Sequence, residues 1–519
     1  MDLLKFQLEK VIKSKKIKFL FVKKIYLSLF SASFFFVSGN AQSVEDALRY
    51  SFQPINGTAR SMAIGGAMTS LGGDISATFV NPAGLGFYKT SEALFTHGWK
   101  INAPKSNYRD INEQRYSNGF ALGPMGFVSG FRNPFNPQSS NAFSIAVTQT
   151  ANFNNLISYH GLNNYSSAAE QYVEEIYAAS IDQGLNRRGV LNTPAYAHGS
   201  SLAISTLLVD SFFNGSPQIE ALPKKYLIDN GIAVMQSNRV ETSGGITEIA
   251  IAFANNNQDK LYWGATVGVP IVRYERNTTY TESDPSNNKT NNFNYYTLHD
   301  NLKTRGVGLN AKVGIIYRPV NYIRVGAAIH TPSLLGLTDT RTADMTTDTE
   351  GYNGVSSAQS TTFTGGVEGK SSYTAITPWR FLLSGSYVFR EIEDVTKQKG
   401  FITADVEYVG YNNSTFRTGG EFSSSGDDAY YKDLNTIISD YYKGALNFRL
   451  GGELKFNTIM ARAGFAYYGN PYSYKSLKAN KTLLSAGIGY RDKGIFADLT
   501  YVYAIQKNVH FPYHLDEKL

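Results

Sequence analysis

The sequence of 519 residues contains no cysteine and only three tryptophans. Without thiols the chain has no disulfide framework, no cysteine nucleophile and no cysteine-ligated zinc. Its seven histidines show no HExxH or similar ligand spacing, and neither a P-loop nor a G-x-S-x-G nucleophile elbow occurs. Beyond the N-terminal region, no run of 18 apolar residues predicts a transmembrane helix. We therefore expect no enzyme, metal or cofactor, although Ser and His residues brought together by the fold could still form a lipase site.

The N-terminal residues 1–41 have the three parts of a secretory signal peptide. Eight lysines and two acidic residues are followed by the 13-residue apolar run Ile25–Val37 and by the small-residue site Gly39-Asn40-Ala41. Thirteen apolar residues are too few to cross a bilayer of about 30 Å as a helix. We expect an exported protein whose mature chain begins near Gln42.

The basic charge belongs mostly to this leader. The whole chain carries 49 basic and 42 acidic residues, a net charge of +7, of which residues 1–41 contribute +6. The mature chain is therefore near +1, and its charge gives no reason to expect a nucleic-acid partner.

Alternation of apolar and polar residues dominates the rest of the chain. Clear examples are 402–408, 446–454, 484–490 and 495–505. Such period-2 runs predict strands with one apolar and one polar face, in either a soluble sandwich or a membrane barrel. The predicted strands lie near 91–101, 116–130, 141–151, 244–254, 261–273, 304–317, 321–332, 376–389, 400–411, 444–456, 458–468, 481–490 and 494–506.

The loops between these strands favour the barrel. Long gaps at 102–115, 152–243, 274–303, 333–375, 412–443 and 469–480 alternate with gaps of ten residues or fewer. Short periplasmic turns and longer extracellular loops are typical of an outer-membrane barrel, whereas a sandwich has no reason to sort its loops by side. The fold class predicted is all-β, an antiparallel up-and-down transmembrane barrel.

The longest loop, 152–243, is predicted to hold structure of its own. Ser166–Ser180 has helical periodicity, and Ser201–Phe213 and Ile219–Ile232 are two further candidate helices. We interpret this extracellular insertion as a cap over the barrel mouth, with a substrate funnel as the alternative.

The segment before the first strand is rich in glycine. Gly65-Gly66 and Gly72-Gly73 allow tight backbone packing, and Asn81-Pro82-Ala83-Gly84 is a turn signal. The run ARSMAIGGA followed by ISATFVNPAGL resembles the N-terminal hatch of the FadL family of outer-membrane long-chain fatty-acid transporters. Residues 304–333 and 376–389 resemble that family as well, so the likeness covers most of the mature chain.

The resemblance implies a 14-stranded barrel (91–519) plugged by a hatch (42–90), in the outer membrane and in contact with its lipid. It implies passive uptake of hydrophobic small molecules, long-chain fatty acids above all, by hatch-gated lateral diffusion. The hatch motif is then Asn81, Pro82, Ala83 and Gly84. The lateral gap is expected at the third strand, 141–151, where Ala151–Asn155 could break the pairing.

Several charged residues share the polar phase of the strands: Glu248, Lys312, Arg324, Arg380, Asp405, Glu407, Arg449, Glu453, Lys455, Arg462 and Asp498. Charge on the lipid face is costly, so these residues are predicted to face the lumen. Their mixed signs favour mutual pairing that holds the hatch. The alternative is that some receive a substrate carboxylate, and the candidates are Arg324, His330, Arg380, Arg449 and Lys312.

The number of predicted strands is one fewer than a closed barrel of this type requires. Thirteen strands are predicted, whereas single-chain bacterial barrels have an even number. We expect the closing strand to be missing, as in a truncated gene product, with the first and thirteenth strands poorly paired.

Two other functions remain open at this stage. A related branch of the superfamily acts as a carrier in type IX secretion, so a binding or assembly protein with a protein partner is the main alternative. A general porin conflicts with the hatch. Substrate identity, oligomeric state and protein partners do not follow from the sequence.

Overall fold

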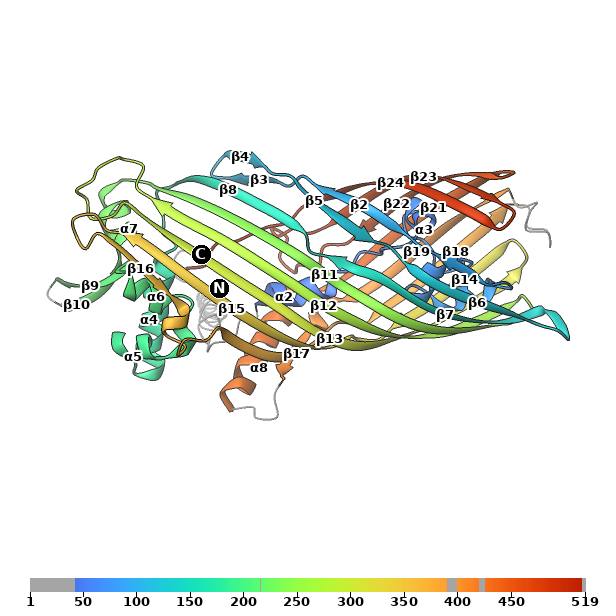
Figure 1. The fold of residues 1–519 in the computed structure, drawn as a ribbon, viewed down its shortest axis with the longest axis horizontal. Coiled ribbons are helices and arrows are strands. Elements are labelled where there is room, and N and C mark those ends of the chain that lie inside the picture. The colour runs from blue at the N-terminus through green and yellow to red at the C-terminus, as the bar shows by residue number, and fades with distance from the viewer. Residues whose placement is uncertain (1–42, 215, 390–398, 420–424, 516–519) are drawn as a thin grey trace, which may run out of the picture.

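The computed structural model describes residues 43–214, 216–389, 399–419 and 425–515. The predicted signal peptide, 1–41, lies outside the described residues. The described chain forms a long curled sheet of 18 strands, which together with the two-stranded sheet of β2 and β5 is here called the wall. Helices gather at one end of the wall, and short helices lie inside it (Figure 1).

The wall has thirteen rows of antiparallel strands when strands that continue one another are counted as one row. Rows one to three are β1 (Glu92–Leu94) with β2 (His97–Asn102), β5 (Ser117–Leu122) with β6 (Met125–Asn133), and β7 (Asn136–Asn152) with β8 (Asn155–Asn163). Rows four to six are β11 (Val234–Asn257), β12 (Leu261–Ser283) and β13 (Tyr295–Val320).

The remaining rows complete the curl. Rows seven to nine are β14 (Ile323–His330) with β15 (Leu334–Asp348), β18 (Arg380–Phe389) with β17 (Gly369–Ile376), and β19 (Gly400–Gly410) with β20 (Thr415–Thr418). Rows ten to thirteen are β21 (Gly444–Phe456), β22 (Ile459–Tyr468), β23 (Lys481–Asp492) and β24 (Ile495–Gln506).

All thirteen predicted strands are present, and the all-β antiparallel prediction is confirmed. In the part of the chain that the structure describes, the residue registers pair β24 with β23 and β1 with β6. The described residues 507–515 contain no strand.

Several segments that the sequence analysis placed in long loops contain regular structure. The gap 333–375 holds β15, β17 and β16 (Val355–Gln359), and the gap 102–115 holds a hairpin of β3 (Lys105–Tyr108) and β4 (Ile111–Gln114). The gap 412–443 holds η7 (Tyr411–Asn413), β20 and α8 (Ser425–Tyr441). These strands prolong the wall beyond its apolar band, so their sequences lack the apolar alternation from which strands are read.

The insertion after β8 folds into a cap over one end of the wall. It contains α4 (Glu170–Gln183), α5 (Arg187–Asn192), η3 (Pro194–Tyr196), α6 (Ser200–Ser205), α7 (Leu222–Tyr226) and η4 (Ile228–Asn230). The predicted helix 166–180 matches α4. The helices predicted at 201–213 and 219–232 are mostly wrong, because α6 ends at Ser205 and a hairpin, β9 (Val209–Asn214) with β10 (Ser216–Ala221), follows.

The cap has its own apolar core. Buried side chains from α4, α6, α7 and the outer ends of β12, β13 and β15 pack together, among them Tyr172, Ile176, Leu202, Leu222 and Met345. The shared core fixes the cap against the wall, and η5 (Ser360–Thr362) lies beside it.

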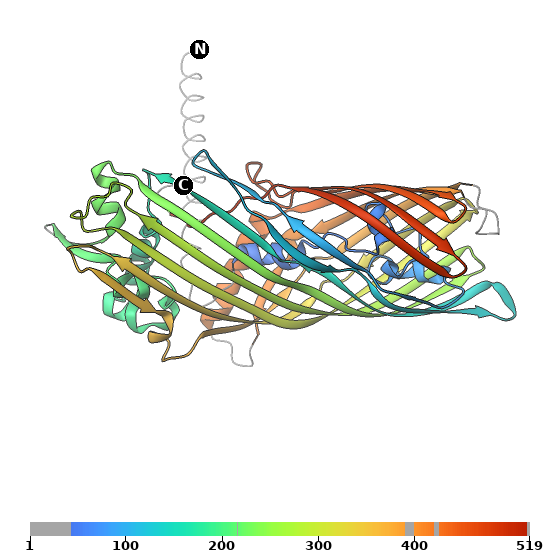
Figure 2. The ribbon, with the colours of Figure 1, turned by 45° about the horizontal axis from the view of Figure 1, so that its top comes forward.

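The N-terminal segment 43–91, here called the hatch, runs inside the curl (Figure 2). Its short helices are α2 (Val44–Ser51), α3 (Ala59–Ala63), η1 (Ile75–Thr78) and η2 (Pro82–Phe87). Thr78 bonds to Ser144 of β7, and the Ala63 carbonyl accepts a hydrogen bond from Ser485 of β23, so the hatch reaches widely separated rows.

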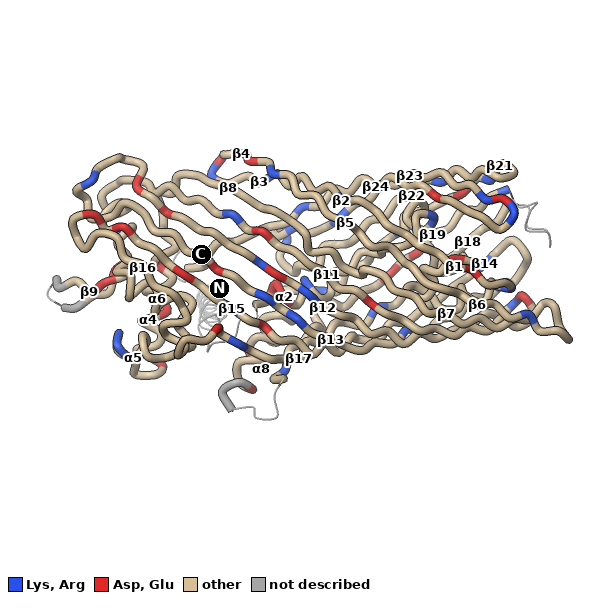
Figure 3. The backbone as a smooth tube through the Cα atoms, in the orientation of Figure 1, with Lys and Arg blue, Asp and Glu red and all other residues tan. Residues whose placement is uncertain are grey.

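The two faces of the wall have opposite chemistry, as predicted. Leu446, Phe448, Leu450 and their counterparts on neighbouring strands are exposed on the outer face, whereas Arg449 between them is buried. Charged residues occur along many rows (Figure 3), and several that interrupt the apolar band, such as Glu248, Lys312 and Asp405, are buried on the inner face. An exposed apolar band around a closed-off polar interior is the pattern of a lipid-facing barrel wall. None of the described helices is long and apolar enough to cross a membrane.

A charge introduced into this band is expected to destabilise the protein. Leu450→Arg on β21 places a cation on the exposed apolar face near the middle of its strand, at a cost of about 2–4 kcal/mol. The measurement is the free energy of unfolding by urea in lipid vesicles. Val355→Arg on β16 is the control, since Val355 is exposed beyond the band. Equal stability of the two variants would contradict the lipid-facing assignment.

Candidate functional site

The Asn-Pro-Ala-Gly motif forms a turn that ties the hatch to the wall. The Asn81 side-chain oxygen accepts a hydrogen bond from the Ala83 amide at 3.1 Å, and its amide donates to the Thr69 carbonyl at 2.6 Å. Pro82 opens η2, where its missing N–H costs nothing. A Cβ on Gly84 would lie 2.9 Å from Gly72 Cα, so glycine is required for this packing.

Glycines in the wall form a notch that receives this turn. A Cβ on Gly314 would overlap the Asn81 side chain, and one on Gly264 would lie 2.6 Å from the Pro82 carbonyl. A Cβ on Gly326 would lie 2.5 Å from the Thr69 carbonyl. These glycines come from adjacent rows, β12, β13 and β14, and permit direct contact between hatch and strand backbones.

A second notch receives the Ile64-Gly65 backbone on another part of the wall. Gly451 and Gly464 are register partners on β21 and β22, and a Cβ on either would overlap that backbone. Gly65 and Gly66 have positive φ values of 68° and 76°, which L-residues with side chains rarely adopt. The hatch is thus seated at two places where the wall has no side chains.

Three of the five lumen candidates bond to hatch carbonyls. Arg324 Nη1 donates to the Leu71 carbonyl at 2.9 Å, and His330 Nε2 bonds to the Val80 carbonyl at 2.8 Å. Arg380 Nη2 donates to the Ser51 carbonyl at 2.6 Å. These side chains face the lumen, but their partners are in the hatch and they do not line the large cavity described below.

The other two candidates are paired with buried acids. Lys312 forms an ion pair with Glu248, and Arg449 forms one with Glu407. Arg449 also lies 3.8 Å from Asp405, which accepts two hydrogen bonds from Thr69 of the hatch. Lys312 and Arg449 therefore have acidic partners within the protein, as expected if the lumen charges pair with one another.

Filling a notch is expected to dislodge the hatch. Gly314→Val places methyl groups where the Asn81 side chain lies, and the turn cannot stay seated. Planar-bilayer recordings should then show a large steady conductance that the unchanged protein lacks. Gly385→Val is the matched control, because a Cβ there meets nothing within 4 Å. A closed Gly314→Val protein would show that the notch does not hold the hatch.

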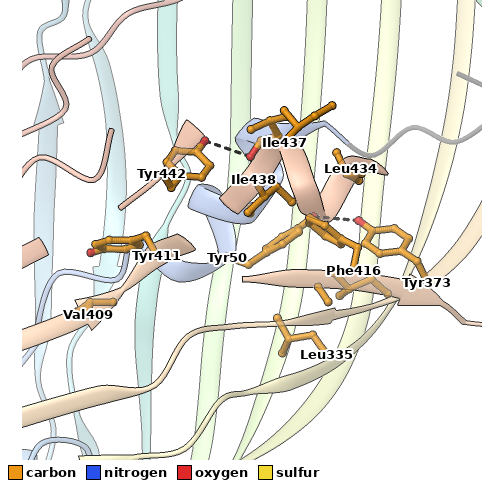
Figure 4. Packing of buried hydrophobic residues seen from close by; sticks show 14 of the residues in the cluster. Tyr50, Leu335, Tyr373, Val409, Tyr411, Phe416, Leu434, Ile437, Ile438 and Tyr442 are labelled. Atoms are coloured by element: carbon orange, nitrogen blue, oxygen red, sulfur yellow. Dashed lines mark hydrogen bonds between the residues drawn. The ribbon is translucent and has the colours of Figure 1, made fainter. Parts of the chain in front are cut away.

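A cavity of about 3300 Å³ lies between the hatch and the cap. One face of α2 packs into an aromatic cluster with α8, where the Tyr50 hydroxyl lies 3.3 Å from that of Tyr373 (Figure 4). Leu48 of α2 and Phe52, which follows the helix, pack against this cluster and also line the cavity. Further apolar lining comes from the wall and loops, notably Phe153, Tyr274, Tyr472 and Leu477. The cavity is therefore suited to molecules with large apolar parts.

Two arginines, Arg276 and Arg341, lie on the cap side of the cavity, where the carboxylates of Asp300 and Glu175 also line it. Arg276 and Arg341 both bond to Asp300, at 2.8 and 2.6 Å, so two cations share one carboxylate. Arg276 Nε is buried and has no hydrogen-bond partner among the described residues. Burial and the neighbouring Arg341 lower the pKa of His198 below its ordinary value of 6.5, so that ring is neutral at neutral pH. The arrangement can receive an anionic head group.

The wall is broken beside this cavity, between rows two and three. The β6–β7 register ends at Met125 and Val147, and β5, which continues row two, is in register with β2. On its other side, β7 stays paired with β11 as far as Asn152, with an irregularity at Ile246/Thr247. Residues 149–155 and Phe120 line the cavity at this point. The interruption begins at Thr148 and so overlaps only in part with the 151–155 segment that the sequence indicated; its use as an exit remains a prediction.

Sequence reasoning missed the cavity arginines. Arg276 and Arg341 lie on strands that extend past the apolar band, in segments read as loops. Only the pairing of β12, β13 and β15 brings them to Asp300. Among the described residues, no group of three or more His, Asp or Glu residues could hold a metal ion.

Comparison with known proteins gives a likeness of fold. No protein-family model matches the chain, and no curated protein matches it by sequence. The chain is similar to the CymD monoaromatic hydrocarbon channel at 11% identity and a TM-score of 0.45, with 88% of this chain and 94% of that chain covered. It is also similar to a Pseudomonas aeruginosa FadL homologue (13%, 0.48, 88% and 91% covered) and to the Ralstonia pickettii toluene transporter TbuX (14%, 0.40, 88% and 100%).

Proposed function

We propose that this protein carries hydrophobic compounds passively across an outer membrane, and that long-chain fatty acids are its preferred cargo. The observation that supports this most directly is the cavity of about 3300 Å³, which lies above a seated hatch and extends to a break in the wall. Burial of each CH₂ group is worth about 0.8 kcal/mol, so an apolar cavity extracts a long acyl chain from water.

Two cationic side chains in the cavity, Arg276 and Arg341, favour an acid over a neutral hydrocarbon. Arg276 and Arg341 would bind the carboxylate while the acyl chain lies against Phe153 and Tyr274. Guanidinium groups bind carboxylates in a planar, bidentate manner, which suits them to this role. Two of the similar structures are a monoaromatic hydrocarbon channel and a toluene transporter, and binding of both cargo classes should be measured.

The route follows from the position of the hatch. Cargo would enter beside the cap, bind in the cavity and leave sideways between rows two and three into lipid. A path straight through the hatch would require release of both glycine notches and of the bonds from Arg324, His330 and Arg380. We assign those three residues, together with Arg449 and the Asn81–Gly84 motif, to holding the hatch in place, whereas Lys312 pairs with Glu248 within the wall.

The uptake proposal is tested in cells. Deleting the gene in its host, in a strain lacking paralogues, should reduce uptake of radiolabelled palmitate, and restoring the gene should reverse the loss. Mass spectrometry of the purified protein should find bound fatty acid. Unchanged palmitate uptake in the deletion strain would show that the protein serves another purpose.

Loss of the cavity arginines is expected to weaken binding of acids selectively. Arg276→Leu with Arg341→Leu removes charged hydrogen bonds worth about 1.5–3 kcal/mol each, so oleate should bind at least about 10-fold more weakly. Toluene binding should be unchanged because it has no carboxylate. Both affinities are measured by calorimetry in detergent.

The control for this pair is Arg239→Leu, since Arg239 is exposed on β11 and its partner is the equally exposed Glu241. Equal weakening of oleate and toluene binding would mean that the arginines only hold the cavity together.

A further inference from the structure

The break between rows two and three leaves backbone groups of the wall without strand partners. From Thr148 to Asn152, β7 has the β11 ladder on one side, and the registers of the described residues give it no partner on the side of β5. Pro124 adds to the interruption of row two, because proline has no N–H to donate. In hydrocarbon every such backbone group needs a hydrogen bond.

Side-chain amides supply these bonds across the break. Asn56 of the hatch donates from its amide nitrogen to the Leu122 carbonyl on row two and to the Gln149 carbonyl on row three, both at 2.8 Å. Asn152 donates to the Phe120 carbonyl at 3.4 Å, and Asn102 donates to the Asn154 carbonyl at 2.6 Å. Of these amides, only that of Asn56 comes from the hatch.

Asn56 sits on a short connector whose two ends are fixed. On its N-terminal side, Arg380 holds the Ser51 carbonyl and the Ile55 N–H donates to the Tyr468 hydroxyl at 3.1 Å. On its other side, Thr58 caps α3. The connector crosses the floor of the cavity, and Phe52, Ile55 and Asn56 all line it. Any molecule bound at this end of the cavity touches the residue that bridges the break.

We propose that Asn56 is the latch of the lateral exit: its amide joins row two to row three in the empty protein, and cargo on the cavity floor displaces it. The proposal rests on the proposed function for the cargo. Closure by Asn56 needs no cargo and can be tested without it. Because both partners are carbonyl oxygens, the latch requires an N–H donor, which an ionised carboxylate or an apolar side chain cannot supply.

The test measures the width of the break by pulsed electron spin resonance. The chain has no cysteine, so spin labels attach only to introduced ones, at Phe120→Cys on row two and Leu156→Cys on row three. The full-length protein is reconstituted in phospholipid nanodiscs. Asn56→Leu and Asn56→Asp are compared with Gln53→Ala, a control on the same connector whose amide bonds to the Tyr50 carbonyl within the hatch.

Without ligand, the unchanged protein and the Gln53→Ala control should give one narrow distance. Asn56→Leu and Asn56→Asp should give a broader, longer distribution, because loss of two hydrogen bonds shifts the closed–open equilibrium about 30-fold. Adding oleate to the unchanged protein should move its distribution towards that of Asn56→Leu. Equal melting temperatures for all variants show that the hatch remains folded.

The outcomes separate the latch from the transport proposal. A narrow distance in ligand-free Asn56→Leu would overturn the latch, even if oleate binds and palmitate uptake is intact. Bound oleate that leaves the distance of the unchanged protein unaltered would overturn release by cargo. Failure of oleate to bind would count against the proposed function, and the ligand-free comparison would still decide whether Asn56 closes the break.

Discussion

The constraint on which the structure depends is that no backbone polar group can remain unpaired in hydrocarbon. It accounts for the continuous pairing of β11, β12 and β13 through the apolar band, although these strands of 24, 23 and 26 residues also extend past that band. It also explains why the backbone groups need other hydrogen-bond partners where the strand pairing stops. Between rows two and three, hydrogen bonds from side-chain amides replace strand pairing. These bonds can break while the strands on both sides keep their own pairing.

The hatch solves a second problem, which is to fill a wide lumen without becoming part of the wall. It uses little regular structure, and its stability comes from contact with the strands. Glycines at Gly314 and Gly451 let the backbones meet, while arginines such as Arg324 and Arg380 reach its free carbonyls. From the sequence, these arginines are candidates for a substrate-binding site. In the structure they donate hydrogen bonds to backbone carbonyls of the hatch, which is buried and has little regular structure.

The cavity is what remains between this plug and the cap, and its chemistry differs from that of the wall below. Near the hatch, acids and bases neutralise one another, as Glu407 and Arg449 do. Near the cap, two arginines share Asp300, and aromatic residues line the space around them. The two ends of the cavity therefore differ in chemistry, with charged groups at the cap side and apolar side chains further in.

The sequence by itself determined the strands and their faces, since alternation such as that of Leu446 to Leu454 follows directly from the period of a strand between lipid and lumen. It also marked the hatch, because paired glycines and Asn81-Pro82 have strong local conformational preferences. Only the tertiary structure decided which charges belong to the hatch and which to the cavity. That choice depends on strands far apart in the chain: Arg276 and Arg341 meet Asp300 through β12, β13 and β15 pairing, and Asn56 meets Leu122 and Gln149 only after the hatch is seated.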